Sequence, residues 1–546
     1  MTTPLDPAND PPGPWHLAFA SGDAVAVTTH HLATDAAVAV MAAGGNAVDG
    51  AIAANAVLGV VLPDTCGVGG DLFALVHRPG MTVPAALNAS GFAGSGATAE
   101  GLRRRGTLEM PLRGPETVTV PGCVDGWEAL LAAYGTMPLA TVLAPAIALA
   151  GDGFAVSVEL AESLASIIDL VGGDVIGASP VRTLFPDGAA PVAGTVLRRP
   201  DLAATLRLVA DGGRAAFYEG PVGRGIVTAT GGVVTRGDLA LAQAEWVDPV
   251  GARIHGRDAW TIPPNSQGYL TFAALIVAAS TGAGADPDDP AAQHALIEAS
   301  RAVASERDDL VTDPATAPLP PDRLLDPARL AGYTAAISDG AAAGWGRSRG
   351  VPGGTAYLCT RDGDGMGVSL IQSNFHDVGS GLVAGDTGVF LHNRGAGFTL
   401  TRDHPNELAP HRRPLHTLSP TLWTDAGGLR LLLGTRGGHY QPQILAQVAS
   451  HRLAAGLTLP DAVDAPRWVV DRSAGDGWTV SVESRMPGAV VEGLRRRGHP
   501  VVVTGARQSD WGPVAAIEIG AAADRRSGGG IACGDPRVST SGTAIA

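Results

Sequence analysis

The sequence contains no lysine, and all 38 basic residues among its 546 are arginine. A pyridoxal-phosphate Schiff base, a P-loop and a Ser-Lys dyad each require a lysine, so these three kinds of site are excluded. Acidic residues outnumber basic ones, giving a formal net charge of −15. This balance argues against a nucleic-acid-binding protein, which normally presents a basic face.

Cysteine is scarce as well. Cys66, Cys123, Cys359 and Cys533 are scattered, with no CxxC pair and no histidine cluster at zinc-ligand spacing. We therefore expect four buried free thiols and no metal site.

Long hydrophobic runs are absent too. No apolar run approaches the roughly 20 residues that span a bilayer. The polar, proline-rich start of the chain has neither the basic nor the apolar part of a secretion signal. These absences predict a cytoplasmic protein without a membrane partner.

The hydrophobic pattern predicts a mixture of helices and strands. Helices are expected over 34–43, 46–60, 125–134, 139–150, 158–171, 202–210, 222–229, 269–283, 292–307 and 441–455. Strands are expected over 24–29, 72–77, 83–88, 355–361, 367–374, 388–392, 420–424, 429–433, 478–482, 500–504 and 513–519, the last one closing the chain. Residues 337–354 are expected to form an exposed linker.

Thr355 stands at the head of a predicted strand, directly after Gly353 and Gly354. If the bond before Thr355 were cut, its hydroxyl and a new α-amino group would belong to one residue. An α-amino group with a pKa of roughly 8 is a usable base near neutral pH. Threonine with its own N-terminal amine is a self-contained nucleophile and base. The local pattern alone favours the alternative, a hairpin whose first residue happens to be threonine.

Motifs spread along the chain favour the first interpretation. They are GGNAVDGA (44–51), GVGGD (67–71), VPGCVDGW (120–127), PPNSQG (263–268), GTAYLC (354–359), VSLIQS (368–373), GSG (379–381), GDTG (385–388) and LGTRGG (433–438). In this order they resemble the γ-glutamyltranspeptidase (glutathione hydrolase) family of N-terminal-nucleophile hydrolases. The resemblance covers nearly the whole chain, from His31 to Pro536.

The resemblance implies an α+β fold, a four-layer αββα sandwich built from a precursor that cuts itself between Gly354 and Thr355. Residues 1–22 would be a disordered head, and 23–354 and 355–546 the large and small chain segments of one αββα unit. Thr355 would be the nucleophile and Ser373 a second hydroxyl beside it. Gly437 and Gly438 would form the oxyanion hole, and no cofactor or metal is expected.

The substrate pocket departs from the family pattern. Residues 88–92 (NASGF) lack the arginine that holds the substrate carboxylate in the family, Gly397 stands where an acid is expected, and the 416–417 pair replaces two serines. An arginine elsewhere could supply the carboxylate-binding fork. The candidate substrate-binding residues are Asn374, Arg394, His416, Thr417 and Arg436. We predict weak activity on γ-glutamyl amides and better relative activity on glutaryl amides.

The sequence therefore favours an amidohydrolase or acyltransferase that passes an acyl group from Thr355 to water or an amine. An acylase for another amide, of glutaryl or cephalosporin type, is one alternative. An uncleaved, inactive binding protein is the other. The expected partners are a small-molecule amide, water or an amine acceptor, and the two segments of the same precursor. A homodimer is left open.

Overall fold

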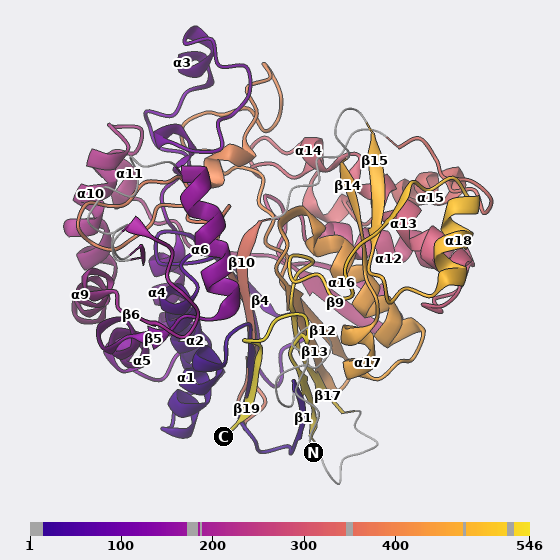
Figure 1. The fold of residues 1–546 in the computed structure, drawn as a ribbon, viewed down its shortest axis with the longest axis horizontal. Coiled ribbons are helices and arrows are strands. Elements are labelled where there is room, and N and C mark those ends of the chain that lie inside the picture. Colours follow the sequence, from indigo (N-terminus) through magenta and orange to yellow (C-terminus); the bar gives the residue numbers. More distant parts are fainter. Residues whose placement is uncertain (1–14, 172–183, 186–187, 346–352, 473–476, 521–528) are drawn as a thin grey trace.

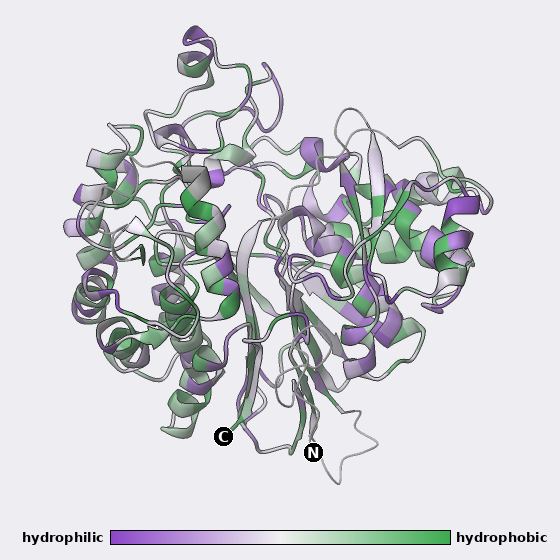
Figure 2. Cartoon of the chain, viewed as in Figure 1, coloured by the Kyte–Doolittle hydropathy of each residue, from purple (hydrophilic) through white to green (hydrophobic). Residues whose placement is uncertain are grey.

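The computed structural model describes residues 15–171, 184–185, 188–345, 353–472, 477–520 and 529–546. Its elements form four layers, in which two sheets lie face to face between two layers of helices (Figure 1). The expected α+β sandwich of αββα type is confirmed. Hydrophobic stretches run through the helices on both sides of the sheets (Figure 2).

The first sheet carries the predicted nucleophile. Across the sheet its strands are β19 (Gly542–Ile545), β2 (Val25–Thr28), β10 (Gly354–Arg361), β11 (Gly367–Phe375), β3 (Asp71–His77), β4 (Ala85–Ala89) and β7 (Glu245–Val247). Every neighbouring pair is antiparallel. Strand β10 lies inside the sheet, between β2 and β11, so the segment that begins at Thr355 is held on both sides.

The second sheet packs against the first. Across it the strands are β1 (His16–Phe19), β18 (Gly530–Cys533), β17 (Val514–Ile519), β13 (Gly428–Thr435), β12 (Thr421–Asp425), β9 (Arg257–Thr261) and β8 (Val250–Ile254). Side chains such as Phe73, Ile371 and Leu432 fill the space between the sheets. The sheets approach closely at Gly434 on β13, where a Cβ atom would lie 2.1 Å from the Tyr357 ring. No larger residue fits at position 434 without moving the sheets apart.

The first helical layer covers the outer face of the first sheet. It contains α1 (His31–Ala42), α2 (Ala47–Val61), α4 (Cys123–Tyr134), α5 (Leu139–Asp152), α6 (Val158–Val171), α9 (Pro200–Tyr218), α10 (Pro221–Ala229) and α11 (Arg236–Ala240). Helix α2 is buried along its whole length, which its alanines and glycines allow. The N-cap residue of α2, Asn46, accepts hydrogen bonds from the backbone N–H groups of Val48 and Asp49 and so satisfies donors that the helix leaves free.

The second helical layer covers the outer face of the second sheet. It contains α12 (Tyr269–Ser280), α13 (Pro290–Ala304), α15 (Pro327–Ala336), α16 (Gln441–Ala449), α17 (Leu459–Asp464) and α18 (Gly488–Arg496). A small sheet of β14 (Trp468–Arg472), β15 (Trp478–Val482) and β16 (Val501–Val503) packs with them. The other α-helices and strands of the described residues are α3 (Ala99–Arg104), α14 (Arg307–Leu310), β5 (Phe154–Ala155) and β6 (Val196–Leu197).

Three sequence predictions are wrong. Residues 16–19 form β1 and pair with β18, so the disordered head does not extend to residue 22; residues 1–14 lie outside the described part. The predicted strand over 388–392 is reduced to a single bridge between Val383 and Phe390. The strand over 513–519 does not close the chain, because β18 and β19 follow it.

The predicted linker, residues 337–354, is exposed only in part, and some of its residues form hydrogen bonds with the rest of the chain. Near its start, the backbone N–H of Ala343 and the indole N–H of Trp345 donate to the buried Glu298 carboxylate. At its end, Gly354 already belongs to β10. Residues 346–352 lie outside the described part of the chain.

Candidate active site

Thr355 is buried at an irregularity in the β10–β11 ladder. The pairing register shifts between Gly354, which faces Phe375, and Ala356, which faces Gln372. The Thr355 side chain is only 1% exposed, and its hydroxyl oxygen has no hydrogen-bond partner among the described residues. Buried hydroxyls are usually hydrogen-bonded, so the Thr355 hydroxyl is an exception.

Ser373 reaches the peptide bond itself. Its hydroxyl donates a 2.5 Å hydrogen bond to the carbonyl oxygen of Gly354 and accepts one of 2.7 Å from the backbone N–H of Phe375. The sequence predicted a contact with Thr355, but the hydroxyl bonds the carbonyl oxygen of the residue before it, at the irregular part of the ladder. A donor at this oxygen withdraws electron density from the carbonyl carbon and stabilises an oxyanion formed there.

Gly437 and Gly438 turn the chain from β13 into the short helical turn Gly438–Tyr440 that precedes α16. Both have positive φ, 116° and 55°, a region that glycine enters without steric cost. A Cβ atom on Gly353 would lie 3.3 Å from the Cα of Gly438, so this turn borders the same peptide segment as Ser373. The Gln267 side chain fixes the turn by donating to the carbonyl oxygens of Gly438 and Thr417.

Arg394 lies behind Ser373 and is fully buried, with 0% of its surface exposed. Its guanidinium donates to the hydroxyl of Thr417 at 3.2 Å and to that of Ser373 at 3.4 Å. It also stacks 4.0 Å from the centre of the Phe375 ring. Its Nε has no partner in the described part of the chain. Burial lowers the pKa of Arg394 to about 9, and the Asp71 carboxylate acts against this shift through its charge.

Asp71 and His416 form a buried pair beside Arg394. The Nε2 of His416 lies 3.0 Å from Oδ2 of Asp71, and the Nδ1 of His392 lies 3.6 Å from the same oxygen. Burial, followed by the Arg394 charge, lowers the pKa of His416 to about 3. Burial alone would raise the pKa of Asp71, but His392, the His416 hydrogen bond and Arg394 together hold it below its ordinary value. His416 is thus fully buried and neutral near neutral pH.

Asn374 is buried, and neither its amide oxygen nor its amide nitrogen has a partner among the described residues. The amide lies against Gly67 and Gly70, where added Cβ atoms would come within 3.5 Å and 2.7 Å of it. Of the five predicted substrate-binding residues, Arg394 and Thr417 are in direct contact, His416 bonds Asp71, and Asn374 lies near the end of β11.

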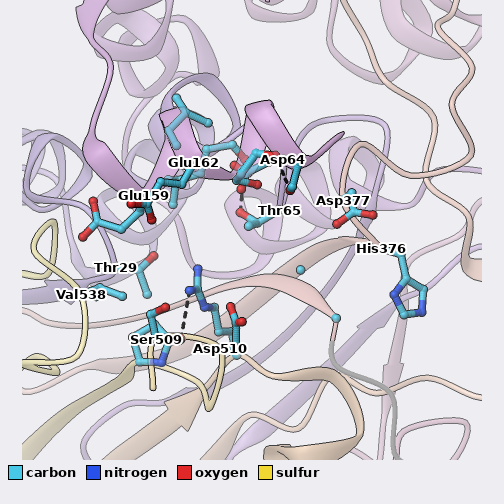
Figure 3. A pocket seen from close by; sticks show the side chains of 18 of the residues that line it. Thr29, Asp64, Thr65, Glu159, Glu162, His376, Asp377, Ser509, Asp510 and Val538 are labelled. Atoms are coloured by element: carbon cyan, nitrogen blue, oxygen red, sulfur yellow. Dashed lines mark hydrogen bonds between the residues drawn. The ribbon is translucent and has the colours of Figure 1, made fainter. Parts of the chain in front are cut away.

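Arg436 lies in a different part of the site from Arg394. It donates to the backbone carbonyl of Ser509 and lines a cavity of about 560 Å³ that also borders Gly353 and Gly354. Figure 3 shows this cavity, with Glu159 and Glu162 of α6 on one side, His376 and Asp377 on the other and Asp64 between them. The two arginines that the sequence offered as alternatives thus lie at different places around the reaction centre.

The described residues hold no cluster of three or more His, Cys, Asp or Glu that could bind a metal ion. All four cysteines are buried and free, as predicted. Among the described helices, none is long and apolar enough to cross a membrane.

Sequence reasoning missed Asp64, Asp71 and Gln267. Asp71 and Gln267 lie within the motifs at 67–71 and 263–268. The motifs therefore singled out both residues, but they did not indicate which hydrogen bonds the side chains make. Asp64 follows Pro63 in a stretch without any motif, and only the fold brings it beside Gly354.

Comparison with known proteins places these residues in a family context. The family model described as Gamma-glutamyltranspeptidase matches residues 33–544. The glutathione hydrolase-like YwrD proenzyme of Bacillus subtilis (strain 168) is 35% identical over 90% of this chain and 94% of its own. The oxamate amidohydrolase proenzyme of Klebsiella pneumoniae subsp. pneumoniae is 35% identical over 95% of this chain and 99% of its own.

A solved structure agrees with the fold. The crystal structure of cephalosporin acylase from Bacillus halodurans superposes with a TM-score of 0.89 at 32% identity, covering 100% of this chain and 98% of that one. The similarity therefore extends over both sheets and both helical layers.

Proposed function

Because the chain belongs to the γ-glutamyltranspeptidase family of N-terminal-nucleophile hydrolases and transferases, we propose that Thr355 is its nucleophile and that the chain cuts itself before Thr355. The Thr355 hydroxyl attacks the Gly354 carbonyl carbon, an ester forms, the C–N bond breaks, and the hydroxyl proton ends on the freed amine. Water then hydrolyses the ester and restores the hydroxyl.

The same groups would run the catalytic cycle. The new α-amino group, with an ordinary pKa of roughly 8, takes the hydroxyl proton as Thr355 attacks an amide substrate, and gives it to the departing amine. The acyl-enzyme ester on Thr355 then passes its acyl group to water or to an amine acceptor. Ser373 and the Gly437–Gly438 turn border the carbonyl on which negative charge develops.

One observation carries this proposal. The buried, unpartnered hydroxyl of Thr355 adjoins a carbonyl that already receives a 2.5 Å hydrogen bond from Ser373. A structural threonine at the head of a strand would need neither feature.

For the acyl donor we propose an amide whose acyl group ends in a carboxylate and lacks an α-ammonium. Arg394 supports this choice, because it is a buried cation with an unpartnered Nε one hydrogen bond from Ser373, and guanidinium pairs well with carboxylate. An ammonium at the same place would be repelled. Oxamate, named for one relative, is an amide of this kind, and glutaryl amides are another. The cytoplasmic location stays a prediction.

The test compares three donors that share the p-nitroanilide leaving group: glutaryl, γ-glutamyl and butyryl. We expect kcat/KM to be highest for the glutaryl donor and at least about tenfold lower for the γ-glutamyl donor. A factor of this size corresponds to the free energy of one hydrogen bond to a charged group. Arg394→Met should remove the advantage of glutaryl over butyryl, and Arg394→Lys should retain part of it. A preference for γ-glutamyl that survives Arg394→Met would contradict this donor class and favour a rebuilt glutamate pocket.

A further inference from the structure

The cavity beside the Gly354–Thr355 bond has an excess of negative charge. Among the described residues that line it, Asp64, Glu159, Glu162, Asp377 and Asp510 are acidic, and Arg436 is the one arginine. Burial, followed by the Arg394 charge, lowers the pKa of His376 to about 4, so His376 adds no positive charge near neutral pH.

Some of this charge is already compensated. Asp377 forms a 2.8 Å ion pair with Arg113, and one Glu159 oxygen accepts a hydrogen bond from the backbone N–H of Ser539. The other Glu159 oxygen, Oε2, is buried without a partner among the described residues. Glu162 lies on the same helix, α6, and is exposed to the cavity mouth.

Asp64 is the feature that indicates a ligand. It is only 8% exposed, lines the cavity, and its Oδ1 has no hydrogen-bond partner in the part of the chain that the structure describes. Its backbone carbonyl oxygen would lie 3.1 Å from a Cβ atom on Gly354, so Asp64 stands next to the bond that is cut. A buried carboxylate oxygen without a donor is costly, and a donor from a bound molecule would relieve that cost.

Charges of opposite sign therefore lie at separate places near the Gly354–Thr355 bond. Arg394 donates to Ser373 and is not among the described residues that line the cavity. Asp64 and the α6 carboxylates do line it. Burial raises the pKa of Asp64, and the Ser163 hydrogen bond and the Arg436 charge oppose that shift. A cation in the cavity would add to the groups that favour the ionised form.

We propose that this cavity binds the amine half of the substrate, the part that leaves or that accepts the acyl group, and that it selects amines carrying a further cationic group, with Asp64 as the buried acceptor. This rests on the proposed function, since it assumes an acyl group anchored at Arg394. An acyl group ending in a carboxylate would be repelled from the cavity, which leaves the cavity to the amine half. The substrate class is then an amide with an anionic acyl end and a cationic amine end.

The experiment uses the cleaved wild-type enzyme and two donors that differ only in one charge, Nα-glutaryl-lysine amide and Nα-glutaryl-norleucine amide. We expect kcat/KM to be about tenfold higher for the lysine amide, as one hydrogen bond between charged groups provides. Most of the difference should lie in KM, and it should shrink as salt rises, because the α6 carboxylates act partly through solvent. Asp64→Asn should bring the ratio of the two donors close to one.

Asp211→Asn is the matched control. It removes the same charge from an exposed position on α9, away from the cavity, and should leave the ratio of the two donors as it is in the wild type. A wild-type ratio near one, or an Asp64→Asn ratio equal to that of the wild type, would overturn the inference. Failure to hydrolyse glutaryl-p-nitroanilide would instead overturn the proposed function, so the two failures are distinguishable.

Discussion

For Ser373, the hydrogen bond in the structure differs from the contact that the sequence predicted. The sequence predicted it beside the nucleophile, and its hydroxyl instead donates to the Gly354 carbonyl oxygen. Two separate motifs, at 354–359 and 368–373, contained the two residues. The direction of the hydroxyl depends on how the two strands meet in space, which neither motif contains.

Ser373→Ala should slow both self-cleavage and turnover. The substitution removes a donor to the carbonyl that becomes an oxyanion, a loss of about 10²–10³-fold in kcat in comparable sites. The rate of cleavage of freshly made protein and kcat on glutaryl-p-nitroanilide measure it. Ser369→Ala is the control, because Ser369 is a buried serine of the same strand that contacts the Tyr357 hydroxyl instead. Equal rates for both variants would exclude a chemical role for Ser373.

Pairs of residues far apart in sequence were beyond prediction. His416 and Asp71 are 345 positions apart and lie 3.0 Å from each other. Each belonged to a segment singled out in the sequence, yet nothing in either segment pointed to the other. Asp64 does not lie in any of these segments. An acidic residue after a proline indicates no function by itself, and only the fold places Asp64 beside Gly354.

At the scale of elements, long periodic helices and buried strands were predictable. Helix α6 agrees with its predicted bounds, and so does strand β15. The short strands β1, β18 and β19 escaped prediction because four residues carry little periodicity and their pairing partners are remote. Strand 388–392 was predicted from its apolar residues, but the chain there makes glycine-rich turns that leave only one bridge.

The Gly437–Gly438 turn has a testable role. Alanine at 438 would have to adopt the positive φ of 55°, at a cost of about 1–2 kcal/mol, and would shift the turn that borders Gly353. We expect Gly438→Ala to reduce kcat by as much as about 100-fold, part of what one oxyanion donor provides. Steady-state kinetics and thermal melting measured together separate activity from stability.

Gly456→Ala provides the comparison for that turn. Gly456 also has a positive φ, 78°, but a Cβ atom there would meet nothing within 4 Å. The Gly456→Ala variant should lose about as much stability as Gly438→Ala and should keep the kcat of the wild type. If the two variants lost turnover equally, the Gly438 effect would be one of folding and the turn would not belong to the oxyanion site.

For the whole molecule, buried neutral histidines predict how stability depends on pH. Burial is the main cause that lowers the pKa of His30, His376, His416, His451 and His499 to about 3 or 4. Unfolded, each would titrate near 6.5. Their contribution is fully present above pH 6.5 and is lost as pH falls toward the folded values, because the unfolded chain then binds more protons.

The free energy of unfolding should therefore decrease between about pH 6.5 and 4, by up to about 1.4 kcal/mol per pH unit for each histidine. Urea unfolding of Thr355→Ala, expected to stay in one piece, measures it through tryptophan fluorescence. His451→Leu should flatten the dependence, since both His451 ring nitrogens are buried without partners among the described residues. His411→Gln, an exposed site, should not. A flat profile would contradict neutral burial.

The fold also explains why self-cleavage need not separate the two segments. In the first sheet, β2 of the large segment lies between β19 and β10 of the small one, and β3 of the large segment pairs with β11 of the small one. Strands from both segments thus share one hydrogen-bonded sheet. The sequence could suggest the sandwich only by resemblance, because the order of strands across a sheet depends on contacts that local patterns do not contain.

The most direct measurement is the mass and N-terminal sequence of the purified protein, under native and denaturing conditions. The account predicts one native species of 55.1 kDa per chain that separates on denaturation into two pieces, the smaller beginning Thr355-Ala356-Tyr357. Thr355→Ala should remain a single chain under both conditions. A wild-type chain that stays intact after prolonged incubation, or a cut at any other bond, would contradict the claim that Thr355 becomes the N-terminal nucleophile.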